Sequence, residues 1–88
     1  MYGYYYYNNY YNNHYPAHHF RQRLSADQAI QIALQRIPGQ VLHVDLEMEN
    51  GVLVYEIYIL SPQNKIYEVE VNSRTGRIIK IEEEDDFD

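Results

Sequence analysis

The sequence predicts an α+β domain in which one N-terminal helix packs on a four-stranded antiparallel meander, with the helix first and the four strands after it. Two observations carry this prediction. Apolar residues recur at helical spacing before Gly39, and the period changes to two after it. Turn signals then divide the alternating part into four short segments. We expect one face of the sheet to pack on the helix and the other to face water.

Residues 24–39 (LSADQAIQIALQRIPG) contain the signals of a helix start, a helical stripe and a helix end. Ser25 and Gln28 form a capping box, and Asp27 suits the positive end of the helix dipole. A Pro-Gly pair closes the segment. The residues of the single apolar stripe are Ala26, Ala29, Ile30, Ala33, Leu34 and Ile37. A helix with one such stripe needs a sheet to cover it.

Three turn signals divide the rest of the domain: Asn50-Gly51, residues 61–64 with their proline, and NSRTG at residues 72–76. The first is the strongest short signal for a hairpin. Between the turns, apolar and polar residues alternate, and the last strand is expected at residues 77–81. The residues predicted to face the helix are Leu42, Val44, Leu46, Met48, Leu53, Tyr55, Ile57, Ile59, Tyr67, Val69 and Val71.

This order of signals resembles the PepSY domain family over residues 24–83. The resemblance rests on the Ala-rich helix that ends in Pro-Gly, on the pairs Tyr55-Glu56 and Tyr67-Glu68, and on a closing turn of the Asn/Asp-x-x-Thr-Gly kind. It implies a non-catalytic module of a type found in propeptides of secreted metallopeptidases and in bacterial envelope proteins. Such a module is expected to bind a protein or peptide and to modulate or inhibit a protease.

We expect residues 1–23 to form a disordered low-complexity tail and residues 84–88 a disordered acidic one. The first eleven residues, MYGYYYYNNYY, contain seven tyrosines and no charged side chain. Tyrosine rings and asparagine amides form contacts in many registers, so the N-terminal tail is expected to be adhesive without being folded. A disordered terminus without a role is the alternative.

Targeting and metal-binding signals are weak in the tail. His14, His18 and His19 lie close together, but Pro16 and the lack of a helical pattern give them no fixed geometry, so we expect no specific metal site. The chain has neither the pattern of a signal peptide nor an apolar run of about 18 residues, which predicts no membrane span. Synthesis in the cytoplasm is therefore expected, with the final compartment unknown.

Charge is divided unevenly along the chain. Residues 1–23 contain two arginines and no acid, whereas residues 24–88 contain thirteen acids and five bases. Such an acidic module should repel nucleic acid, so the predicted partners are cationic or neutral proteins or peptides. The chain contains no cysteine, no glycine-rich phosphate loop and no zinc spacing. We therefore predict no cofactor, no metal and no enzymatic activity.

The turns also predict the register of the strands. If Asn50 and Gly51 are the two loop residues, Asp45 lies opposite Glu56, and a five-residue second loop then sets Glu56 opposite Glu70. Opposed like charges cost about 0.2 to 1 kcal/mol per pair, so this row is a candidate surface for a basic peptide or a cation. The neutral members of the same candidate face are His43 and Tyr58, and its rim is Glu47 and Glu68.

A solvated acidic face explains the same row without a partner, since charge keeps a domain soluble and Lys80 near Glu68 or Glu70 would relieve the repulsion. A Ca²⁺ site is not expected, because side chains on a flat sheet do not wrap an ion with six to eight oxygens. Catalysis is not expected either, because a sheet face offers no cleft that would shift the pKa of one carboxyl.

The second functional hypothesis is structural. A tyrosine-rich tail and an acidic domain on one chain favour association between chains, and this composition is similar to that of bacterial spore-coat and other coat proteins. A meander also leaves two edge strands open. Under this alternative the chain associates with itself through the tail or through a sheet edge.

Overall fold

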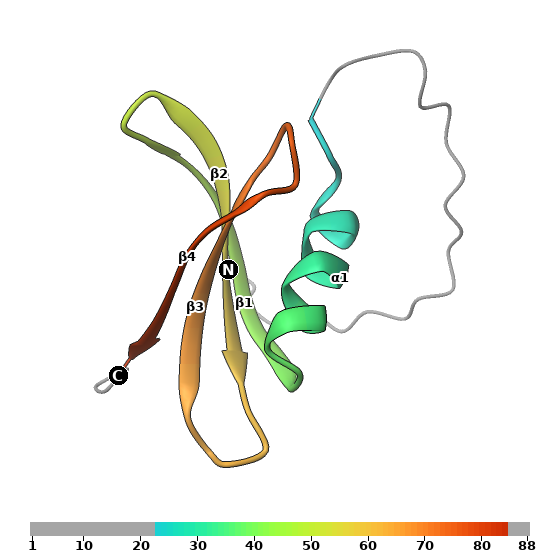
Figure 1. Ribbon diagram of the computed structural model, residues 1–88, viewed down its shortest axis with the longest axis vertical. Helices are drawn as coiled ribbons and strands as arrows, with labels where there is room; N and C mark the ends of the chain where they lie inside the picture. Colours follow the sequence, from blue (N-terminus) through green and yellow to red (C-terminus); the bar gives the residue numbers. More distant parts are fainter. Residues whose placement is uncertain (1–22, 85–88) are drawn as a thin grey trace.

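The computed structural model describes residues 23–84, and in this range one helix is followed by four strands. They are α1 (Ala26–Arg36), β1 (Gln40–Glu49), β2 (Val52–Leu60), β3 (Ile66–Asn72) and β4 (Ile78–Glu84). The strands form one antiparallel sheet in the order β1-β2-β3-β4, and α1 lies against one of its faces (Figure 1). The predicted fold class is confirmed. The predicted tails, residues 1–23 and 84–88, lie outside the described range except for Arg23 and Glu84. The histidines His14, His18 and His19 also lie outside it.

The start of α1 is fixed by the predicted capping box. The amide of Gln28 donates to Ser25 Oγ at 3.1 Å, and the amide of Ser25 donates to Gln28 Oε1 at 2.8 Å. Two amides that the helix leaves without intrahelical partners are thereby satisfied. Arg36 lies in the last turn, where its charge suits the helix dipole.

The hydrophobic core lies between α1 and the two middle strands. Its fully buried helix residues are Ala29, Ile30 and Ala33, and its buried sheet residues are Tyr55, Ile57, Ile59, Val69 and Val71. Burying one isoleucine or valine side chain contributes about 1.5 to 3 kcal/mol. The Tyr55 hydroxyl also donates to the carbonyl of Leu24 at 2.7 Å, which ties the segment before α1 to β2.

The inner face of the sheet, the face that carries α1, is not covered along its whole length. Leu46 and Met48 are 39% and 64% exposed, although their alternation predicted that they would face the helix. The reason is length: the eleven residues of α1 span about 16 Å, whereas the ten residues of β1 span about 33 Å. The hairpin end of β1 therefore extends beyond the helix.

The first and last turns have the conformations that their sequences predict. Asn50 and Gly51 both have positive φ, 51° and 83°, as a two-residue type I′ hairpin requires. In the last turn, Asn72 Oδ1 accepts from the amides of Arg74 and Thr75 at 2.8 and 3.1 Å. The side chain of Asn72 thus holds the backbone of the turn.

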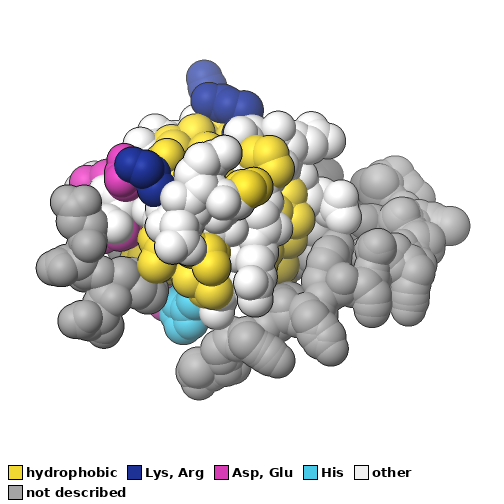
Figure 2. All heavy atoms as spheres, turned by 90° about the horizontal axis from the view of Figure 1, so that it is seen from below, with side chains coloured by type: hydrophobic (Ala, Val, Ile, Leu, Met, Phe, Trp, Pro, Cys, Tyr) yellow, Lys and Arg dark blue, Asp and Glu magenta, His cyan; other side chains and the backbone are white. Residues whose placement is uncertain are grey.

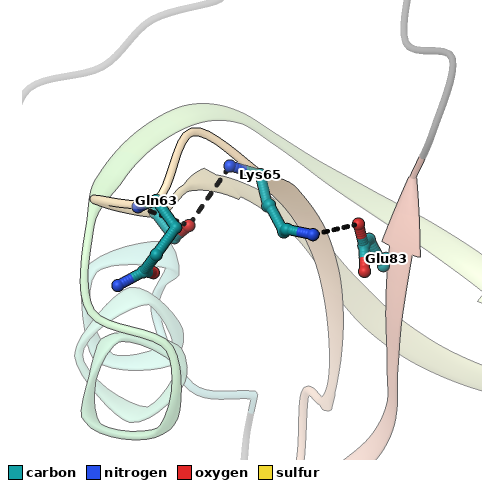
Figure 3. A network of polar contacts seen from close by, with 4 residues as sticks. Gln63, Lys65 and Glu83 are labelled. Atoms are coloured by element: carbon teal, nitrogen blue, oxygen red, sulfur yellow. Dashed lines mark hydrogen bonds and ion pairs between the residues drawn. The ribbon is translucent and has the colours of Figure 1, made fainter.

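The second turn, residues 61–65, is held by a buried serine and an ion pair (Figure 3). Ser61 Oγ accepts from the amides of Gln63 and Lys65 at 3.3 Å each. The ammonium of Lys65 lies 3.4 Å from a carboxylate oxygen of Glu83. This loop gives the predicted pairing of β2 with β3, so that inward residues lie opposite one another.

Candidate functional site

Three carboxylates lie side by side on the outer face of the sheet, the face opposite α1. Asp45 on β1 pairs with Glu56 on β2, and Glu56 pairs with Glu70 on β3. We call these three residues the carboxylate row. Lys80 on β4 pairs with Glu70 and ends the row on that side. The predicted register is confirmed.

The neutral residues predicted for this face, His43 and Tyr58, lie two residues from Asp45 and Glu56 on the same strands. His43 pairs with Tyr58, and the centroids of their rings are 5.8 Å apart. His43 Nε2 also lies 3.0 Å from Asp45 Oδ2, which joins this pair to the carboxylate row. The five predicted site residues therefore share one face, and their role in binding stays a prediction.

The prediction of a fully wet outer face is wrong for the two middle strands. Glu56, Glu68 and Glu70 are only 9%, 7% and 6% exposed. Each side chain on β2 and β3 has neighbouring strands on both sides, and these neighbours shield it from water. On the edge strand β1, Asp45 is half-buried and Glu47 is exposed. The exposure of the row to water therefore decreases from Asp45 on β1 to Glu70 on β3.

Burial and like charges together change the proton affinity of Glu56. The pKa of its carboxyl is raised from 4.5 to about 7, first by burial and then by the negative charges of Glu68, Glu47 and Glu70. A side-chain hydrogen bond with Glu49 raises this pKa further. Two carboxyl groups form such a bond only when one of them holds a proton. Glu56 is therefore about half protonated near neutral pH.

A second carboxyl on this face behaves in the same way. Burial raises the pKa of Glu68 to about 7; the charge of Lys80 opposes this shift, whereas Glu70 and Glu84 add to it. Burial and the charges of Glu68 and Glu56 also raise the pKa of Tyr58 to about 12. The expectation that a sheet face cannot shift a carboxyl pKa is wrong. The alternation of glutamates in the sequence indicates that Glu68 lies on the outer face, but alternation alone does not indicate how deeply a side chain is buried.

Lys80 neutralises part of the face, as the sequence predicted. Its Nζ lies 3.6 Å from Glu70 Oε2 and 3.2 Å from Glu82 Oε1. The pKa of Lys80 is raised above its ordinary value, first by the hydrogen bond to Glu82, although burial opposes this. Because Lys80 lies on β4 opposite Glu70, its positive charge is at the β4 end of the face. Seen from below, the molecule also has acidic side chains that gather beside a basic one, at the left of Figure 2.

Several carboxylates of this face come close enough to share a cation. Three groups have ligand oxygens within 4.8 Å of one another: Asp45, Glu47 and Glu56; Glu49, Glu56 and Glu70; and Glu68, Glu82 and Glu84. Acidic groups on a surface commonly lie this close without an ion. The strand register places all these residues on the outer face, so their oxygens approach from one side. Ca²⁺ instead needs six to eight surrounding oxygens. We therefore assign no metal site.

A hollow of about 480 Å³ lies away from the row, between the tip of the first hairpin and the last turn. Its lining residues are Met48, Gly51, Val52, Leu53, Asn72, Ser73, Arg74 and Thr75. The carboxylate row does not line it, so the carboxyls with raised pKa are not enclosed with a substrate there.

Within residues 23–84, no helix is both long enough and apolar enough to cross a membrane.

Residues 23–82 match the PepSY family, which is described as "Peptidase propeptide and YPEB domain". The chain belongs to the PepSY family. The resemblance predicted from the sequence is confirmed, and the matched residues include α1, the first three strands and the whole carboxylate row. In this PepSY chain, the sheet rather than the hollow presents the clustered ionisable groups.

Two relatives contain the same module within longer chains. The uncharacterized protein YkoJ of Bacillus subtilis (strain 168) is 34% identical over 62 residues, which cover 70% of this chain and 36% of YkoJ. The crystal structure of a lipoprotein candidate from Clostridium difficile 630 is similar with a TM-score of 0.67 and 31% identity, covering 70% of this chain and 40% of that one. This chain therefore matches less than half of each relative.

Proposed function

We propose that this PepSY chain is a non-catalytic module that binds a protein or peptide through the outer face of its sheet, and that the bound segment is cationic. One observation carries the proposal: Asp45, Glu56 and Glu70 lie side by side on three strands, and the last two are largely buried. Folding alone does not favour this arrangement, because opposed like charges destabilise a sheet. A bound cationic group would turn that repulsion into attraction.

The geometry also favours one direction of approach. Lys80 already lies beside Glu70 at the β4 end, whereas the side chain of Asp45 is 45% exposed at the β1 end. A lysine or arginine side chain that enters from β1 reaches Asp45 first and Glu56 next. An arginine can bind a carboxylate through two parallel hydrogen bonds, which adds geometric specificity. Complementary charge of this kind also speeds association.

The family description supports a peptidase as the partner, with this module modulating or inhibiting its activity. We propose no catalytic role for the chain itself. Glu56 and Glu68 have the shifted pKa values that acid-base catalysis uses, but they lie on a sheet face outside the hollow. Adding the chain to a panel of secreted metallopeptidases and measuring their hydrolysis rates tests the modulation directly.

The binding proposal is tested with two labelled nine-residue peptides, one alternating lysine with valine and the other glutamate with valine. We expect the full chain to bind the lysine peptide, more weakly as salt increases, and to ignore the glutamate peptide. The double variant Asp45→Asn, Glu56→Gln should bind at least tenfold more weakly. Glu83→Gln is the control for each single variant, Asp45→Asn and Glu56→Gln, because it removes one acidic group as they do, but Glu83 pairs with Tyr67 on the inner face. Equal affinity of both peptides would contradict the proposal.

A second candidate function is assembly into a coat-like structure. It is supported by the seven tyrosines among the first eleven residues and by the two edge strands, β1 and β4. Sedimentation of the full chain over a range of concentrations tests it. Large assemblies that disappear when the eight tyrosines of residues 1–20 are replaced by serine would favour this function, and a monomer at all concentrations would exclude it.

A further inference from the structure

The first strand is an open edge of the described sheet. β1 pairs with β2 on one side only (Figure 1). The amide of Ser73 donates to the carbonyl of Leu53, so the backbone groups of Leu53 are directed toward β3. In an antiparallel ladder, this direction alternates from residue to residue. Val54 and Glu56 are therefore directed toward β1, where they pair with Glu47 and Asp45.

The same alternation decides which groups of β1 are free to bond outward. Since Asp45 and Glu47 bond toward β2, the amides and carbonyls of Val44, Leu46 and Met48 are directed away from the sheet. These are the groups that an additional strand would use. Leu46 and Met48 lie in the half of β1 that extends beyond α1, whereas Val44 packs against the core.

The side chains along this edge are sorted by polarity. On the outer face, the edge carries Asp45 and the exposed Glu47. On the inner face it carries Leu46 and Met48, which are 39% and 64% exposed. The hollow of about 480 Å³ adjoins Met48, so an apolar side chain beside this residue has space to become buried. An amphipathic strand fits this edge on both faces.

We propose that β1 binds an extended segment of a partner protein as a fifth strand, and that this segment alternates basic with apolar residues. This inference rests on the proposed function and names its mode of binding. The basic side chains of the added strand lie beside Asp45 and Glu47, and its apolar side chains lie beside Leu46 and Met48. Backbone hydrogen bonds give affinity, and the two sorted faces select the sequence.

A second copy of this chain fits the edge poorly. If β1 paired with β1 of another copy, the acidic side chains of both strands would share one face, and opposed like charges cost about 0.2 to 1 kcal/mol per pair. The other edge strand, β4, ends in three glutamates and offers no alternating basic pattern. The charge of the edge therefore selects a foreign, cationic strand.

Selective methylation of the peptide backbone tests strand addition separately from charge attraction. The probe is the nine-residue lysine-valine peptide, compared with two versions that are N-methylated either at every valine or at every lysine. All three carry the same charge, but each methylated version lacks the donors along one edge only. In antiparallel addition the valines opposite Leu46 and Met48 bond to β1, so methylation of the valines should weaken binding at least tenfold, and methylation of the lysines should not.

If the peptide adds parallel to β1, methylation of the lysines instead of the valines should weaken binding. Weaker binding of only one methylated peptide, whichever it is, supports the inference. Equal binding of all three peptides would overturn strand addition while leaving the proposed function intact, and so would equal loss for both methylated peptides. No binding of the unmethylated peptide would overturn both. Amide exchange gives a second readout: the amides of Val44, Leu46 and Met48 should become protected only when the peptide is present. Protection without peptide, together with a dimer in sedimentation, would instead assign the edge to a second copy.

Discussion

Glu56 on β2 lies directly opposite Glu70 on β3, and the two residues are only 9% and 6% exposed. Two carboxyls in such a position do not both ionise without cost. The raised pKa of Glu56 is one response to this cost, and the ammonium of Lys80, 3.6 Å from Glu70, is another. The row is therefore neutralised by a base at its β4 end and partly by protons at its centre.

This relationship makes the stability of the fold depend on pH. The pKa values of Glu56 and Glu68 are about 7 in the folded chain and return to about 4.5 on unfolding. The folded state thus holds protons more tightly, so the free energy of unfolding should fall as pH rises from about 4.5 to about 7. We expect a loss of about 1 to 3 kcal/mol between pH 5.5 and pH 8, measured by urea unfolding. A stability that rises over this interval would contradict the assignment.

Removing the charge of Glu56 should stabilise the chain. Glu56→Gln abolishes the repulsion from neighbouring carboxylates and should raise the free energy of unfolding by about 0.5 to 2 kcal/mol at pH 8. The gain should shrink at pH 5.5, where Glu56 is already protonated. In the control, Glu83→Gln removes an exposed ion pair with Lys65 and should change stability by less than about 1 kcal/mol. A melting temperature lowered at pH 8 by Glu56→Gln would argue against repulsion at this position.

Two glycines with positive φ should respond differently to alanine. At Gly39, an added Cβ would overlap the backbone carbonyl oxygen of Leu60, whereas at Gly51 it would meet nothing within 4 Å. Gly51→Ala should therefore cost only the conformational penalty, about 1 to 2 kcal/mol. Gly39→Ala should cost about 3 kcal/mol or more, because backbone must move. Equal costs in urea unfolding would show that the connection from α1 to β1 is less tightly packed than the structure indicates.

The features that could be predicted from the sequence are those fixed by local chemistry. The capping box at Ser25 and Gln28 starts the helix, and Asn50-Gly51 closes the first hairpin. Because side chains alternate with a period of two, this one turn also sets which residue of β1 lies opposite Glu56. The family resemblance and the register of the carboxylate row followed from such signals.

The features that could not be predicted depend on packing over longer distances. Alternation places Leu46 and Met48 on the helix side, but their exposure depends on where α1 ends relative to β1. It places Glu56 and Glu70 on the outer face, but their burial depends on both lying in middle strands. The register shift between Val41 and His43 likewise has no marker in the sequence. The carboxylate row was therefore predicted in its register and not in its degree of burial.

Proton release on binding tests the central claim, that the carboxylate row receives a cationic segment, most directly. Calorimetric titration of the full chain with the lysine-valine peptide at pH 7, in buffers of different ionisation enthalpy, counts the protons exchanged. A cation beside Glu56 lowers the pKa of that carboxyl, which is about half protonated at pH 7, so the row should release up to about half a proton per bound peptide, and Glu56→Gln should release fewer. Binding heats that are the same in every buffer, or uptake of protons, would contradict the account.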